Sequence, residues 1–99
     1  MDIKLVDRGE VGELILSGKL DSRCICEAEA VFLQVAERFR NVTFNLRELK
    51  FISNSGLRAM KKVYMKLREK NGEMSVINAS QSMVSVIEMT GYAEICNIR

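Results

Sequence analysis

Val42-Thr-Phe-Asn-Leu-Arg-Glu-Leu-Lys-Phe-Ile-Ser-Asn-Ser-Gly-Leu57 is the stretch of sequence that decides the fold. Apolar residues alternate with polar ones in its first part, which is typical of a strand, and its serine-rich end leads into a basic amphipathic segment that reaches Lys70. The pattern predicts a strand, a turn and a helix. At the start of a helix, several backbone N–H groups lack partners and the dipole is positive, so an attached anion meets donors there. Ser55 is therefore a candidate phosphate carrier, and the alternative is that Ser53, Asn54 or Ser55 only caps the helix.

The residues before this stretch predict a β-hairpin and a first helix. Ile3 and Leu5 alternate with polar residues, and residues 7–10 form a turn signal. Residues 11–16 are a second short apolar run, and we expect Gly18 to end the strand that they form. Asp21 or Ser22 can cap the helix that follows. Its apolar side chains recur at steps of three and four residues, at Ile25, Ala28, Phe32, Val35 and Phe39.

The residues after the serine turn predict two helices and two further strands. The second helix ends at Asn71-Gly72, and residues 74–77 form a strand. Ser80 caps a third helix that Thr90-Gly91 ends, and residues 92–98 add an edge strand. Strands that alternate with helices favour parallel pairing. We therefore expect one α/β domain over residues 1–99, with a mixed, mostly parallel sheet of four to five strands, an N-terminal β-hairpin and three main helices packed against the sheet.

Composition narrows the classes of function. The chain has 99 residues and a net charge of +2, so we expect one domain without an appended catalytic domain. Its beginning lacks the features of a signal peptide, and no apolar run approaches the roughly 20 residues that span a bilayer, so we expect a cytoplasmic protein without a membrane partner. The one aromatic residue of the basic second helix, Tyr64, falls on its apolar stripe and not among its charged side chains, which argues against direct binding of nucleic acid.

The chain lacks the sequence motifs that would indicate catalysis or metal binding. It has no histidine to act as a base for a nucleophilic serine, and Ser53 stands where a nucleophile elbow has its first glycine. Cys24 and Cys26 are separated by one residue, whereas redox and zinc motifs usually have two between them. We therefore expect no enzyme activity, no metal and no cofactor, with Cys24, Cys26 and Cys96 as reduced structural residues.

Four motifs, in this order and spacing, resemble those of one protein family. They are Leu16-Ser-Gly-Lys-Leu-Asp21, Phe51-Ile-Ser-Asn-Ser-Gly-Leu57, Asn78-Ala-Ser80 and Val86-Ile-Glu-Met-Thr-Gly91. Together they make the whole chain resemble a free-standing bacterial STAS domain of the anti-sigma factor antagonist type. The central turn of that family usually reads Asp-Ser-Ser-Gly-Leu and is phosphorylated on its second serine, which falls on Ser55. Ser53 stands in place of the family's aspartate, and Asn54 in place of its first serine.

The resemblance implies a phosphorylation-switched interaction module in transcription regulation. The unphosphorylated form captures an anti-sigma factor that is also a serine kinase, and so frees the sigma factor; phosphorylation ends the capture, and a phosphatase is a further expected partner. The implied partner-binding residues are Asp21, Ser53, Asn54, Gly56, Leu57 and Arg58. Asp21 can instead be a helix cap, and Leu57 can instead belong to the core. The alternative function is an unphosphorylated STAS scaffold or a regulatory module that binds a small ligand.

Overall fold

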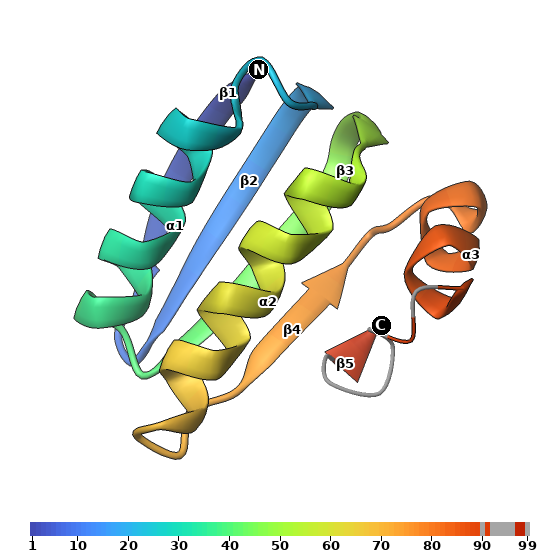
Figure 1. Cartoon of the computed structure of the whole chain (residues 1–99). Helices are drawn as coiled ribbons and strands as arrows, with labels where there is room; N and C mark the ends of the chain where they lie inside the picture. The colour runs from blue at the N-terminus through green and yellow to red at the C-terminus, as the bar shows by residue number, and fades with distance from the viewer. Residues whose placement is uncertain (90, 92–96, 99) are drawn as a thin grey trace.

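Five strands form one sheet in the order β1-β2-β3-β4-β5 in the computed structural model, which describes residues 1–89, 91, 97 and 98 (Figure 1). β1 runs antiparallel to β2, and every other neighbouring pair is parallel. This confirms the predicted mixed, mostly parallel sheet with an N-terminal hairpin. The strands are β1 (Asp2–Arg8), β2 (Val11–Leu20), β3 (Asn41–Ile52), β4 (Met74–Ile77) and β5 (Asn97–Ile98), and the helices are α1 (Ile25–Arg38), α2 (Asn54–Arg68) and α3 (Gln81–Met89).

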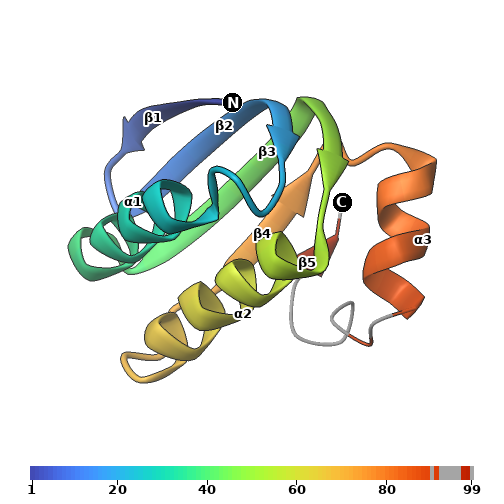
Figure 2. The same ribbon diagram turned by 45° about the horizontal axis from the view of Figure 1, so that its top comes forward.

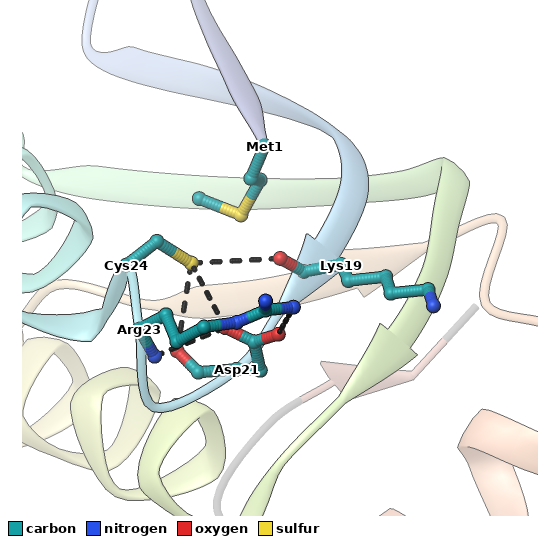
Figure 3. A pocket seen from close by; sticks show the side chains of 5 residues that line it. All are labelled: Met1, Lys19, Asp21, Arg23 and Cys24. Atoms are coloured by element: carbon teal, nitrogen blue, oxygen red, sulfur yellow. Dashed lines mark hydrogen bonds and ion pairs between the residues drawn. The ribbon is translucent and has the colours of Figure 1, made fainter.

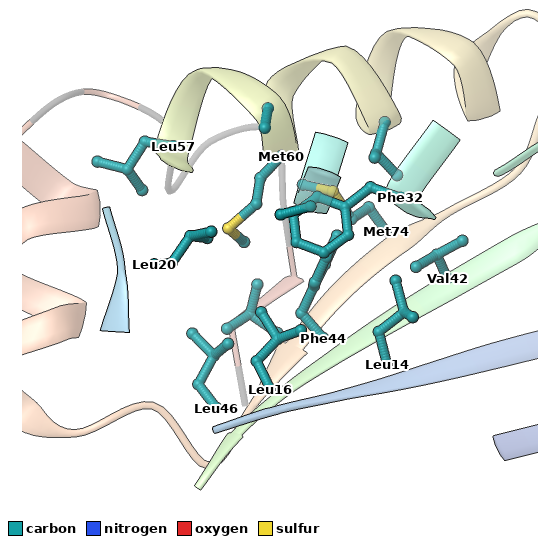
Figure 4. Packing of buried hydrophobic residues seen from close by; sticks show 14 of the residues in the cluster. Leu14, Leu16, Leu20, Phe32, Val42, Phe44, Leu46, Leu57, Met60 and Met74 are labelled. Carbon is teal, nitrogen blue, oxygen red and sulfur yellow. The ribbon is translucent and has the colours of Figure 1, made fainter. Parts of the chain in front are cut away.

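Helices α1 and α2 lie side by side on the same face of the sheet, and α3 lies beyond β4 (Figures 1 and 2). Their apolar faces meet the inward side chains of β2, β3 and β4 in one hydrophobic core (Figure 4). At its centre Phe32 and Phe44 pack edge to face, with ring centroids 5.1 Å apart. Met83 and Ile87 bring α3 into the same core. The periodicity of three and four residues in the first helix and the alternation in the central strand therefore predicted the buried faces correctly.

Two strands run further than their sequence patterns indicated. The expectation that Gly18 ends the second strand is wrong, because β2 continues to Leu20 with Gly18 in a left-handed conformation (φ +90°). Opposite it, β3 continues to Ile52 with register shifts between Ile15 and Ser17 and between Gly18 and Lys19. At each shift β3 advances one residue more than β2. Such bulges let a strand continue where its alternation breaks down.

Of the caps predicted for the first and third helices, the structure confirms only the second one, at α3. The expectation that Asp21 or Ser22 caps the first helix is wrong: the N-cap of α1 is Cys24, and no side chain caps it. Residues 21–24 form a separate turn, in which the Cys24 N–H donates to the Asp21 carbonyl at 3.2 Å. Ser80 does cap α3, since its Oγ accepts the Met83 N–H at 3.3 Å.

The C-terminal ends of α2 and α3, the last strand and the cysteines were also predicted from the sequence. After α2, Asn71 takes a left-handed conformation with φ 59°, and Gly91 takes one after α3 with φ 80°, which suits the predicted ends of these helices. The edge strand is confirmed for residues 97 and 98, whereas Thr90 and residues 92–96, Cys96 among them, lie outside the described part. Cys24 is half-buried and Cys26 exposed, and neither forms a disulfide within the described residues.

Candidate functional site

The candidate site lies where β2 and β3 end, at the edge of the sheet from which α1 and α2 begin. Leu20 and Ile52 are register partners at the ends of these strands, so Asp21 and Ser53 leave the sheet side by side. The Ser53 N–H donates to the Leu20 carbonyl at 2.8 Å, which ties the two exits together. The parallel topology thus brings the first and second motifs of the sequence to one place.

Ser53 is the residue that caps α2. Its backbone is extended (φ −88°, ψ 170°), and its Oγ accepts the Gly56 N–H at 3.2 Å. Its carbonyl accepts the Leu57 N–H at 3.1 Å, which is the first hydrogen bond of the helix. Of the three polar residues that the sequence left open as caps, Ser53 takes this role and Asn54 becomes the first helical residue.

Ser55 is the second residue of α2 and is half-buried. Its hydroxyl makes no hydrogen bond to any residue that the structure describes. It lines an open cavity of about 190 Å³ between the first turns of α1 and α2. The other lining residues are Ile25, Glu29, Arg58, Ala59 and Lys62. The Ser55 hydroxyl is therefore reachable from solvent and is not needed for capping.

An ion pair in this cavity joins α1 and α2. Lys62 Nζ lies 2.5 Å from Glu29 Oε1, with side-chain exposures of 62% and 25%. Arg58, one turn after Ser55, is exposed. Ser55 therefore stands beside one paired and one exposed cation.

Gly56 and Leu57 point into the protein. A Cβ on Gly56 would lie 2.8 Å from Leu20 Cγ and 3.0 Å from Ile52 Cγ1, so only glycine fits without movement. Leu57 is 2% exposed and belongs to the core. The exposed side chains at the start of α2 are those of Asn54 and Arg58, and a partner would meet these instead of Leu57.

Asp21 lies beside a second, larger cavity of about 330 Å³, which Met1, Lys19, Arg23 and Cys24 also line (Figure 3). The Arg23 guanidinium donates to Asp21 Oδ2 at 3.1 Å and the Arg23 N–H to Asp21 Oδ1 at 3.0 Å. These two bonds hold the pKa of the Asp21 carboxyl below its usual value, and the bond from the guanidinium has the larger effect. Asp21 is therefore ionised near neutral pH and already has a partner within the chain.

A family model for the STAS domain matches residues 3–99. The chain belongs to the STAS domain family. Within the described ranges, this STAS domain has no helix of the length and hydropathy that crossing a membrane requires. The same residues contain no group of three or more His, Cys, Asp or Glu side chains placed to hold a metal ion.

Solved structures show the same fold. An anti-sigma factor antagonist from Mycobacterium paratuberculosis has a TM-score of 0.87 at 19% identity, over 98% of this chain and 83% of that one. The Bacillus cell fate determinant SpoIIAA in its phosphorylated form has a TM-score of 0.78 at 19% identity, over 99% and 91% of the two chains. Unphosphorylated SpoIIAA has a TM-score of 0.76 at 20% identity, over 89% and 83%. At these identities the likeness shows the fold alone.

Sequence reasoning placed Ser55 at the start of a helix and named Arg58 as a partner-binding residue of this STAS domain, but it missed Lys62 and Glu29. Arg58 and Lys62 follow Ser55 at three and seven residues, a spacing that puts all three on one face of a helix. That spacing could have pointed to Lys62 as well. Glu29 comes from α1, and its ion pair with Lys62 depends on how the two helices pack.

Proposed function

We propose that this STAS domain is an anti-sigma factor antagonist whose binding is switched by phosphorylation of Ser55. The observation that supports this most directly is the division of roles in the turn. Ser53 caps α2, so the Ser55 hydroxyl is left without a structural partner in the described chain. A hydroxyl that the fold does not use, at a solvent-accessible helix start, suits a group that an enzyme modifies reversibly. SpoIIAA, which shares the fold, has been solved in both unphosphorylated and phosphorylated forms.

The chemistry of the switch is a phosphoryl transfer from ATP in the active site of the partner. Ser55 Oγ forms a bond to the γ-phosphorus, the bond from that phosphorus to the bridging oxygen breaks, and ADP leaves. The hydroxyl proton passes to a base of the kinase. Ser55 then carries about −1.5 to −2 charges and three acceptor oxygens. A surface complementary to the neutral hydroxyl loses affinity through repulsion and desolvation, and each 1.4 kcal/mol of that loss is tenfold in binding.

The partners in this proposal are an anti-sigma factor that is also a serine kinase, and a phosphatase that restores the hydroxyl. The unmodified form captures the anti-sigma factor and frees the sigma factor in the bacterial cytoplasm. The proposed contact face consists of Asp21, Ser53, Asn54 and Arg58, with the buried Gly56 and Leu57 supporting it from beneath.

The same site argues for binding in preference to catalysis. A nucleophilic serine needs a base within hydrogen-bond reach. The lysine that shares the cavity with Ser55 is already engaged in an ion pair, since Lys62 Nζ lies 2.5 Å from Glu29 Oε1. No base is hydrogen-bonded to the Ser55 hydroxyl among the described residues, and we propose that the chain has no catalytic activity of its own.

The proposal is tested by incubating the protein with ATP and the serine kinases encoded beside it. Intact-mass measurement should show an added phosphate, and peptide mapping should place it on Ser55. Ser55→Ala should remain able to bind the kinase permanently, and Ser55→Asp should bind it poorly.

Ser82 supplies the matched control, because it is the second residue of α3 as Ser55 is of α2. Ser82→Asp adds the same charge at the same helical position and should leave binding unchanged. Kinase binding by Ser55→Asp equal to that of the parent would refute the switch. Absence of modification by every such kinase would instead favour an unphosphorylated scaffold or a small-ligand module on the same fold.

A further inference from the structure

The cavity beside Ser55 contains more positive charge than the neutral hydroxyl requires. Arg58 and Lys62 both line it, and Glu29 is its one carboxylate among the lining residues. Glu29 is paired with Lys62, which leaves the Arg58 charge unmatched within the cavity. An added anion at position 55 would restore the balance.

The helix geometry directs both cations toward position 55. Ser55, Arg58 and Lys62 lie on one face of α2, and Cα–Cβ bonds in a helix tilt toward its N-terminus. The Arg58 side chain therefore extends over the turn that carries Ser55. Lys62 begins about 10 Å further along the axis and extends in the same direction to line the same cavity. The Gly56 N–H is already bonded to Ser53 Oγ, so one backbone donor at the helix start is engaged before any phosphate is added.

We propose that Arg58 and Lys62 form a phosphate-receiving site for phosphoserine 55, and that Lys62 exchanges its partner Glu29 for the phosphate. This inference rests on the proposed function, since it describes what happens to the phosphate once Ser55 carries it. The exchange has a surface consequence. The Arg58 charge, exposed in the unmodified form, becomes neutralised within the chain and is withdrawn from any partner that contacts it.

The test uses the full chain with phosphoserine incorporated at position 55 during expression, so that no kinase is required. The second pKa of phosphoserine is about 6, and a neighbouring cation lowers it because the cation favours the dianion. A ³¹P NMR titration reads this pKa directly. Lys62→Gln and Arg58→Gln should each raise it by about half a pH unit, which is the effect of a half-exposed ion pair.

Lys66→Gln is the matched control. Lys66 lies one turn beyond Lys62 on the same helix and pairs with Glu37 at 2.7 Å, but it does not line the cavity. This variant should titrate like the parent. If Lys62→Gln and Arg58→Gln also titrate like the parent, the receiving site does not exist.

Glu29→Gln tests the exchange itself. Removal of the competing carboxylate should lower the phosphoserine pKa below that of the parent, because Lys62 is then held by the phosphate alone. An unchanged pKa in this variant would refute the exchange of partners. Since the phosphate is installed during expression, these outcomes stand apart from whether a cellular kinase modifies Ser55, so the two proposals can fail separately.

Discussion

The division of roles between Ser53 and Ser55 predicts opposite effects of the same substitution at two neighbouring serines. Ser53→Ala removes the Oγ that accepts a hydrogen bond from the Gly56 N–H at 3.2 Å. Because Gly56 is buried, its N–H would be left without a partner. Loss of an N-cap serine costs about 1 kcal/mol of unfolding free energy. For a domain of 99 residues this lowers the midpoint of thermal unfolding by about 4–8 °C.

Ser55→Ala removes a hydroxyl that has no hydrogen-bond partner among the described residues. Alanine has the higher helix propensity by up to about 0.5 kcal/mol, so this variant should be as stable as the parent or slightly more stable. The two alanine variants should therefore differ by about 1 kcal/mol or more in unfolding free energy.

Urea unfolding followed by circular dichroism measures this difference. Ser53→Asp is the control, because aspartate caps a helix as well as serine does and should retain the stability of the parent. If Ser55→Ala destabilises the protein as much as Ser53→Ala, the Ser55 hydroxyl has a structural role and the reasoning is refuted.

Two further predictions concern the packing beneath the site and the pH dependence of stability. Gly56→Ala should lower the unfolding free energy by about 1 kcal/mol in urea unfolding, because crowding against Leu20 outweighs the gain in helix propensity; a more stable variant would contradict the close packing. The Asn45 amide, 3.1 Å from Glu13 Oε2, is the main cause that lowers the pKa of Glu13, followed by Arg8. Stability from this lowered pKa is present above the unfolded value of about 4.3 and is lost as pH falls below it. Asn45→Ala should therefore lose less unfolding free energy than the parent between about pH 5 and pH 3, and an equal or steeper loss would contradict this assignment.

The sequence predicted most of the fold because burial imposes a clear period on it. Phe32 and Val35 follow the helical spacing, Phe44 and Leu46 follow the strand alternation, and all four are buried. The length of β3 was not predictable in this way. Its two register shifts disturb the alternation, so the residues between Leu46 and Ile52 lose the strand pattern although they remain in the strand.

The candidate site was predictable only as far as its local chemistry. The position of Ser55 at a helix start followed from the sequence, but Ser53, Asn54 and Ser55 are all polar residues that tolerate a helix start, and geometry alone selected Ser53 as the cap. Asp21 was predicted as a possible cap of the first helix, but it belongs to a turn. The reason is that α1 begins at Ile25, several residues after the polar residues that suggested a cap. The pairing of Glu29 with Lys62 depends on two helices that meet only in the folded chain.

The tight anchoring of the start of α2 has a consequence for how the proposed phosphorylated state would be recognised. Ser53 is held by its bond to Leu20, and the backbone at Gly56 packs against Leu20 and Ile52 so closely that no space remains for a Cβ. Because the backbone is held in this way, a change at residue 55 should cause little structural change at distant surfaces. A molecule that distinguishes the two forms must therefore touch this edge of the sheet itself, and binders of remote faces should treat both forms alike.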